Sequence, residues 1–450
     1  MREIKSDLEK TDAAPAPSLN LIDRLRGSST ARDGAFVLAA QAIGVVIALV
    51  ADRMIFHDLQ ISENGIFSTA LSLRAVLLSI ADCGMAMATV RVGSYFVAKG
   101  MRAKAHAVFR RALVFRWVAA LVVCGVCILC SRFLLANVLD TPSRPYLVFA
   151  CIGGLLGMTT VSWGLDVAQC RRRMGSYFVQ NVGDAILRAL AILVVLRGMD
   201  TPSPRISELI LWTMAAGVIV AALISVMVER EVFADAKGFG LAAPPSVSDE
   251  LHGFIPYAAA ATFLGMIVIY VEVFLLKNLR GSEETAIFAG ARRLGSLLPL
   301  LTAGLTTVML PRASSLQTRE ECVAYIRKAL KISVPLAVVV CGGLALGASF
   351  VVPLLWGKSY DPSIVPLRWM CLAYALSFIA TPLSYVLFPL KRPGTLVIIN
   401  GLTLALSIGL GIYMVNNYGA LGAAWSMLIV RATMIGVLGG ALWKIMRTTA

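Results

Sequence analysis

Hydrophobic segments of about 20 residues follow one another along this chain from Arg32 to Lys444, separated by short polar joints. The hydrocarbon core of a bilayer is about 30 Å thick, so a spanning helix needs about 20 apolar residues. Backbone groups find no water there, and such segments must therefore be helices. The pattern predicts spanning helices at residues 34–51, 65–90, 112–131, 146–168, 177–196, 208–228, 253–276, 285–309, 332–356, 364–388, 394–414 and 420–443.

The twelve expected spans divide into two halves of six. The joint at 229–252 is the longest internal polar segment and separates them, so we expect a linker there. This division predicts an N-lobe at 32–228 and a C-lobe at 253–450. The segment 1–31 carries charged residues and prolines instead of the apolar stretch of a signal peptide, and we expect a cytosolic tail.

The two halves also show an internal sequence repeat with a spacing of 221 residues. Asp52 and Glu272 match if one gap is allowed. Because each half has an even number of spans, both halves would face the same way, as in parallel repeats that enclose a central site. The ungapped matches are Glu63/Glu284, Ile66/Ile287, Phe67/Phe288, Ala70/Ala291 and Leu73/Leu294.

Composition supports the same class of protein. The chain is 58% hydrophobic and only 15% charged, with a mean hydropathy of +0.79, which excludes a soluble domain with a polar coat. We therefore expect an all-α polytopic membrane protein, with about 12 transmembrane helices in two six-helix lobes around a central cavity.

The net charge of +15 reports topology rather than a nucleic-acid partner. Of the 41 lysines and arginines, 26 lie in the joints on the side of the N-terminus and 8 in the joints on the other side. Because positive residues concentrate on the cytoplasmic side, both termini are expected in the cytosol. The other seven lie inside or at the edge of spans. They are Arg74, Arg116, Arg188, Arg292, Arg293, Arg368 and Arg431.

Arginines inside a membrane usually have a specific role, because inserting an ionised side chain at the bilayer centre costs about 2.5–3.5 kcal/mol of free energy on insertion scales. They can line an aqueous cavity, pair with an acid on another helix, or extend to the interface. Asp184 and Arg188 are spaced i, i+4 and can neutralise each other. An excess of arginine in a cavity would attract anions, and guanidinium binds phosphate through two hydrogen bonds.

The residues expected to bind an anionic substrate are Arg74, Arg188, Arg293 and Arg431. The residues expected to couple transport to protons or sodium are Asp82, Asp184 and Glu272.

No signature of catalysis or of a cofactor accompanies these charges. Gly357-Lys358-Ser359 lacks the glycine that a phosphate-binding loop needs, because position 352 is Val352. The nine cysteines lie mostly in apolar runs. Cys124, Cys127 and Cys130 match a C-x-x-C spacing twice, but no histidine or carboxylate lies near them to complete a metal site. We expect no enzyme activity, no cofactor and no metal.

Seven short motifs follow one another along the chain. They are Leu59 to Phe67, Asp82-Cys83-Gly84 with Arg91, Ala168 to Arg172, Glu272 with Ala286 to Arg293, Leu310 to Ser314, Leu355 to Tyr360 and Tyr418 to Ala424. In this order the chain resembles the Wzx-type polysaccharide flippases of the multidrug/oligosaccharidyl-lipid/polysaccharide (MOP) superfamily, across essentially all twelve spans. It departs from them at Asn64 and Ile66, and the Leu-Gly pair of the first joint is absent.

The resemblance implies a flippase that moves undecaprenyl-diphosphate-linked oligosaccharide across a bacterial inner membrane for exported polysaccharide synthesis. It also implies alternating access of the two lobes and contact with membrane lipid, with a polysaccharide polymerase and glycosyltransferases as candidate partners. One alternative is a multidrug exporter of the same superfamily, although cationic drugs favour an acidic cavity. Another is a scaffold of a polysaccharide-synthesis complex that transports nothing.

Overall fold

The structure is a computed structural model that describes residues 29–198, 205–234, 245–298, 319–385 and 393–448. Within these ranges the chain forms helices and no strands. Ten helical stretches are long and apolar enough to cross a membrane. They are Phe36–Asp58, Ile61–Asp82, Arg102–Leu129, Tyr146–Cys170, Met174–Gly198, Ile206–Val228, Thr262–Arg280, Val323–Trp356, Lys358–Thr381 and Ile398–Gly440. The all-helical membrane architecture expected from the sequence is confirmed.

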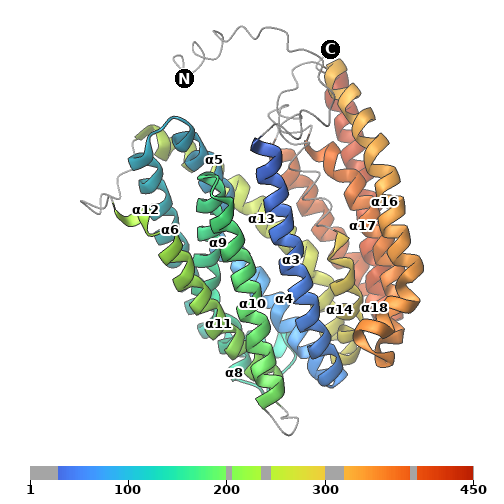
Figure 1. Cartoon of the computed structure of the whole chain (residues 1–450). Coiled ribbons are helices and arrows are strands. Elements are labelled where there is room, and N and C mark those ends of the chain that lie inside the picture. Colours follow the sequence, from blue (N-terminus) through green and yellow to red (C-terminus); the bar gives the residue numbers. More distant parts are fainter. Residues whose placement is uncertain (1–28, 199–204, 235–244, 299–318, 386–392, 449–450) are drawn as a thin grey trace.

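The N-terminal half forms one bundle, which occupies the left and the middle of Figure 1. Its short elements are α7 (Ser131–Phe133), the π-helix Leu134–Val138 and α12 (Glu231–Ala234). Its other helices are α3 (Ser29–Asp58), α4 (Ile61–Asp82), α5 (Met85–Ala98), α6 (Arg102–Leu129), α8 (Tyr146–Ile152), α9 (Leu155–Cys170), α10 (Met174–Gly198) and α11 (Ile206–Val228).

Two expected spans of this bundle are each made of two helices. Residues 65–90 comprise parts of α4 and α5, which join at Cys83 and Gly84, both in the left-handed backbone region (φ 46° and 71°). Residues 146–168 comprise α8 and most of α9, with the break at Gly153 and Gly154. Each break leaves helix-end carbonyls that need new hydrogen-bond donors.

The C-terminal half forms a second bundle. Helix α13 begins at Pro245, within the segment 229–252 that was expected to be a linker. The expected span 285–309 begins in α14 and continues beyond Leu298 into a part that the structure does not describe. The helices are α13 (Pro245–Arg280), α14 (Ser282–Gly295), α16 (Arg319–Trp356), α17 (Ile364–Tyr385) and α18 (Pro393–Thr448), with a 3-10 turn at Lys358–Ser363.

Helix α18 contains the last two expected spans. A sharp bend at Gly419 (φ 57°, ψ −135°) divides it into two helical segments. A Cβ on Gly422 would collide with the carbonyl of Met414, so the chain folds back there. The ten stretches and the twelve expected spans therefore differ at the bend in α18 and at the undescribed residues after Leu298.

A glutamate in each lobe makes equivalent contacts, which matches the sequence repeat. Glu63 on α4 accepts a hydrogen bond from the hydroxyl of Ser207 at the start of α11 (2.5 Å) and pairs with Arg144. Glu284 on α14 accepts one from the backbone N–H of Ala420, just after the bend in α18 (2.7 Å). The hydrogen bond that Arg144 donates to Glu63 raises the pKa of the Arg144 guanidinium.

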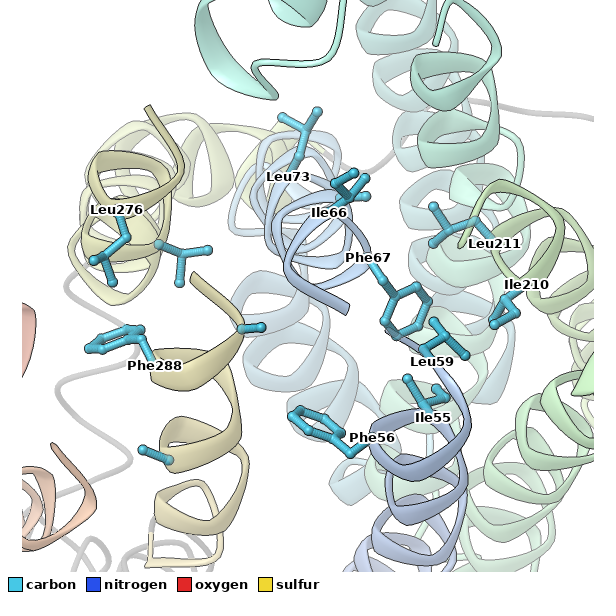
Figure 2. Packing of buried hydrophobic residues seen from close by; sticks show 14 of the residues in the cluster. Ile55, Phe56, Leu59, Ile66, Phe67, Leu73, Ile210, Leu211, Leu276 and Phe288 are labelled. Carbon is cyan, nitrogen blue, oxygen red and sulfur yellow. The ribbon is translucent and has the colours of Figure 1, made fainter. Parts of the chain in front are cut away.

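The main apolar core joins the two bundles. Figure 2 shows Phe56 and Phe67 of the N-lobe near Phe288 and Leu276 of the C-lobe. All four side chains are at most 3% exposed. Helix α3 begins and α18 ends at the same end of the molecule, the upper end of Figure 1. The lobes thus pack around their shared interface, which contains the cavity described next.

Candidate functional site: a basic cavity between the lobes

A cavity of about 340 Å³ lies at the interface of the two lobes. Helices α3, α4, α9, α10 and α11 line it from the N-lobe, and α13 and α14 from the C-lobe. Its charged lining residues are Asp52, Arg74, Arg188, Arg292 and Arg293. Four guanidinium groups thus face one carboxylate, and both lobes contribute to the positive charge.

Arg74 is held by carbonyls of the broken span. Its Nε donates to the carbonyl of Cys151 (3.2 Å), and its Nη2 donates to those of Ala150 (2.6 Å) and Leu211 (3.2 Å). Ala150 and Cys151 lie in the last turn of α8, where the break before α9 leaves carbonyls without helical partners. The buried Nη1 has no hydrogen-bond partner in the described part of the chain. Arg74 therefore completes a helix end, lines the cavity and keeps one donor nitrogen without a partner among the described residues.

Arg188 forms an ion pair with Asp184 on the same helix. Its Nε is 3.0 Å from Oδ1 of Asp184 and its Nη2 is 2.5 Å from Oδ2, one helical turn away on α10. The self-neutralising pair considered from the spacing is thus formed. It reduces the charge that Arg188 brings to the cavity but fixes the direction of its guanidinium.

Arg293 links the two lobes. Its Nε lies 3.6 Å from Oδ2 of Asp52, which is on α3 of the N-lobe. The neighbouring Arg292 donates to the carbonyl of Ile269 (3.0 Å) and lies 4.2 Å from the centre of the Tyr270 ring. Sequence reasoning did not choose Asp52 or Arg292 as site residues. The available signals were the repeat match of Asp52 and the position of Arg292 beside Arg293.

Four of the chosen residues, Arg431, Glu272, Asp82 and Asp184, are not part of the cavity lining. Glu272 on α13 is 5% exposed, and the charges of Arg431 and Arg292 act on it inside the C-lobe. Asp82 pairs with Arg116 (2.9 Å) inside the N-lobe. The cavity thus gathers Arg74, Arg188 and Arg293, and Asp184 joins it only through its pair with Arg188. Arg431, Glu272 and Asp82 do not line it.

Aromatic side chains close the interface beyond the cavity. Phe56 of α3 stacks on Trp356 with ring centres 4.5 Å apart and contacts Tyr360 edge to face at 5.0 Å. The hydroxyl of Tyr360 accepts a buried hydrogen bond from the amide of Asn64 (2.8 Å). These contacts join the end of α3 and the start of α4 to the C-lobe.

The backbones of the two lobes also approach each other closely at this end. A Cβ on Gly65 of α4 would collide with the carbonyl group of Ser282 on α14. Lys277 of the C-lobe donates to the backbone carbonyl of Asp140 in the N-lobe (3.4 Å). We call this set of contacts, at Phe56, Asn64, Gly65, Asp140, Lys277, Ser282, Trp356 and Tyr360, the interlobe seal. It lies at the end of the bundle opposite the start of α3.

The described residues contain no group of three or more His, Cys, Asp or Glu side chains placed to hold a metal ion. The cavity is lined by guanidinium groups and by Ser68, whose hydroxyl has no partner among the described residues. These groups donate hydrogen bonds to an anionic or hydroxyl-rich ligand.

No family model and no curated protein matches the sequence. Solved structures do match the fold over nearly the whole chain. The lipid II flippase MurJ in an inward closed conformation has a TM-score of 0.69 at 13% identity, covering 91% of this chain and 88% of that one. A multidrug resistance MATE family transporter of the MOP superfamily, inward-facing, has 0.68 at 11% identity, covering 92% and 100%.

The MATE transporter VcmN of Vibrio cholerae, in a point-mutant form, has a TM-score of 0.67 at 14% identity and covers 93% of this chain and 98% of that one. Identities this low show the fold alone. The chain therefore has the two-lobed fold of MOP superfamily transporters, and the neighbours named here are a flippase and transporters rather than enzymes.

Proposed function

We propose that this protein is a flippase that moves undecaprenyl-diphosphate-linked oligosaccharide across the bacterial inner membrane by alternating access of its two lobes. The observation that carries the proposal is the cavity between the lobes, whose charged lining residues are Arg74, Arg188, Arg292, Arg293 and one acid, Asp52. The product serves an exported polysaccharide, and both termini lie in the cytosol.

The charge of the cavity favours a diphosphate head group. Guanidinium groups form paired, charge-assisted hydrogen bonds with phosphate oxygens. Because these attractions strengthen where water is scarce, the same charges repel a cation strongly. The neighbour MurJ is a lipid II flippase, which supports a lipid substrate. A multidrug exporter shares the fold, but a basic cavity disfavours cationic drugs.

The size of the cavity requires movement. A volume of about 340 Å³ is near the lower limit of ordinary ligand pockets. A diphosphate with several sugars exceeds it, so the lobes must separate to admit the head group while the lipid tail stays in the bilayer. A ligand that binds one lobe arrangement more tightly shifts the population toward that arrangement.

Ion coupling belongs to the same proposal. Glu272, Asp184 and Asp82 are acids within spans, where ionised groups are costly and commonly serve transport. Glu272 is the coupling candidate of the C-lobe, under the charges of Arg292 and Arg431. A scaffold that transports nothing would have no use for these charges.

The test is the glycolipid content of a strain that lacks the protein, measured by mass spectrometry with the leaflet assigned. We expect a complete diphosphate-linked oligosaccharide to accumulate on the cytosolic leaflet. The wild-type gene should clear it, whereas Arg293→Gln combined with Arg188→Gln should reduce clearance at least tenfold. Arg368→Gln is the matched control, because Arg368 lies on α17, donates within the described part of the chain only to the carbonyl of Ala345 and does not line the cavity.

Two results would reject the proposal. Full clearance by a variant with Arg188, Arg292 and Arg293 all replaced by Gln would show that the cavity charges do not bind the substrate. Normal glycolipids in the deletion strain, together with increased sensitivity to cationic drugs, would identify a drug exporter instead.

A further inference from the structure

A second charged cluster lies inside the N-lobe, away from the cavity lining. Nη2 of Arg116 on α6 is 2.9 Å from Oδ1 of Asp82 on α4 and 2.5 Å from Oδ2 of Asp166 on α9. The Arg116 side chain is 0% exposed, and the two carboxylates are 17% and 15% exposed. One buried nitrogen therefore serves two acids from two other helices.

Among the side chains that the structure describes, the cluster has one negative charge too many. With both carboxylates ionised, two acids face one guanidinium, and a net charge inside a membrane lobe is costly. The other described titratable groups on which the charges of these acids act are the Cys83 and Cys170 thiols and the Tyr177 phenol. Thiols and phenols are ordinarily neutral at neutral pH, so they do not balance the excess. Arg91 lies on α5, and its side chain is outside the described part.

A proton is the ion that fits this excess. Arg116 occupies the space between the two carboxylates, and its positive charge repels a metal cation from the position where both acids could bind it. One proton on a carboxylate oxygen makes the cluster neutral without any space for an ion. The pair of Asp184 and Arg188, by contrast, is already balanced with one acid and one base.

We propose that Asp82, Asp166 and Arg116 form a binding site that takes up one proton from the aqueous phase and couples it to the movement of the lobes. The inference rests on the proposed flippase function for the coupling, but the proton site stands on its own geometry. The acquired proton resides on an oxygen of Asp82 or Asp166, and the remaining carboxylate keeps the ion pair with Arg116.

The position of Asp82 explains how a proton would move the lobes. Asp82 is the last residue of α4, and its Oδ2 accepts a hydrogen bond from the backbone N–H of Ala86 at the start of α5 (3.2 Å). The carboxylate thus holds the joint at Cys83 and Gly84, where the backbone is in the left-handed region. Neutralising it weakens its bond to Arg116 and loosens this joint.

Helix α4 connects the cluster to the rest of the transport path. It also carries Arg74 at the cavity and Asn64 at the interlobe seal. A change at its Asp82 end is therefore transmitted along one rigid helix to the anion site and to the contact with the C-lobe. This continuity is the reason for assigning coupling to the cluster rather than local stability alone.

The first test is infrared spectroscopy of the purified full-length protein in lipid, over a range of pH. We expect a carbonyl band of a protonated carboxylic acid that is lost as the pH rises. Asp166→Asn and Asp82→Asn should each remove it, because the remaining acid then pairs one to one with Arg116. Asp166→Glu should retain a shifted band, and Asp184→Asn is the matched control that should leave it intact.

A band of unchanged amplitude in both Asp166→Asn and Asp82→Asn would overturn the proton site. The second test compares head-group flipping in vesicles with and without a pH gradient, using a diphosphate-linked oligosaccharide lipid as probe. We expect Asp166→Asn to flip without responding to the gradient, whereas the control Glu320→Gln, at an exposed acid at the start of α16 that does not line the cavity, responds normally. A normal response in Asp166→Asn would overturn the coupling. An absence of flipping in the wild type would reject the flippase, while the infrared result would still decide the proton site.

Discussion

Arg74 combines structural support with a free donor, and the two roles are separable by measurement. Its hydrogen bonds to three backbone carbonyls lie in a buried place where an unpaired acceptor costs about 1–3 kcal/mol. We predict that Arg74→Gln lowers the free energy of unfolding by about 2–5 kcal/mol. Arg293→Gln should cost less than about 1 kcal/mol, because its pair with Asp52 is long and one-third exposed.

Thermal unfolding of both variants in the same detergent, followed by intrinsic tryptophan fluorescence, measures this difference. Arg74→Gln should unfold several degrees below the wild type, and Arg293→Gln close to it. Equal unfolding temperatures for Arg74→Gln and the wild type would show that the three carbonyls find other donors. Loss of transport in Arg293→Gln would then be read as loss of anion binding rather than of the fold.

The sequence predicted that charged residues would lie inside spans, but it did not show which residues would pair with them. Hydropathy places Arg74, Arg188 and Arg293 at membrane depth, and the structure brings all three to the cavity. The i, i+4 spacing predicted the ion pair of Asp184 with Arg188. The partner of Asp82 is 34 positions away in the sequence, on α6. No periodicity specifies such a contact, because it depends on how three helices pack.

Helix α18 depends on Glu284 at its bend. The carboxylate accepts the N–H of Ala420 directly after Gly419, which has a positive φ, and it acts as a cap at the start of the new helical segment. We predict that Glu284→Ala costs about 1–2 kcal/mol and lowers the unfolding temperature by about 2–4 °C. Calorimetry of the purified protein measures both quantities.

Glu283→Ala is the control, because Glu283 is the exposed neighbour on the same helix. It should unfold like the wild type. The repeat adds a second comparison, since Glu63 makes the corresponding contact with Ser207 and Glu63→Ala should be destabilising as well. Wild-type stability of both variants would mean that the two glutamates do not hold the lobes together.

At the scale of elements, the hydrophobic pattern located the helices but not their interruptions. The break between α4 and α5 depends on Cys83 adopting a left-handed conformation, which the residue type disfavours and tertiary contacts impose. The pattern read the start of α13 as part of a polar linker, because residues 245–252 are polar. Helices extend beyond the hydrocarbon core when their ends are hydrated, and hydropathy reports only the core.

At the scale of the molecule, the interlobe seal decides which lobe arrangement the chain adopts. Its apolar part stacks Phe56 on Trp356, and its polar part pairs Asn64 with Tyr360. The cavity lies between these contacts and the opposite end of the bundle. Alternating access requires that the contacts of the seal break as a unit, since packed interfaces switch between discrete arrangements.

Gly65 is the residue whose substitution should act on the seal most directly. The backbone of Ser282 occupies the space that a side chain at position 65 would need, so Gly65→Val must push α4 away from α14. Overpacking of this kind costs about 1–3 kcal/mol, and that cost falls only on the arrangement in which the seal is closed. We predict a population shift of about 5- to 150-fold toward arrangements with the seal open.

Pulsed electron paramagnetic resonance with genetically encoded labels at the exposed Asn137 and Asn417, one per lobe, measures the shift. The distance distribution should move to longer values in Gly65→Val. Gly125→Val is the control, because nothing lies within 4 Å of a Cβ at Gly125, and its distribution should match the wild type. An unchanged distribution in a folded Gly65→Val protein would show that α4 and α14 part without opening the seal.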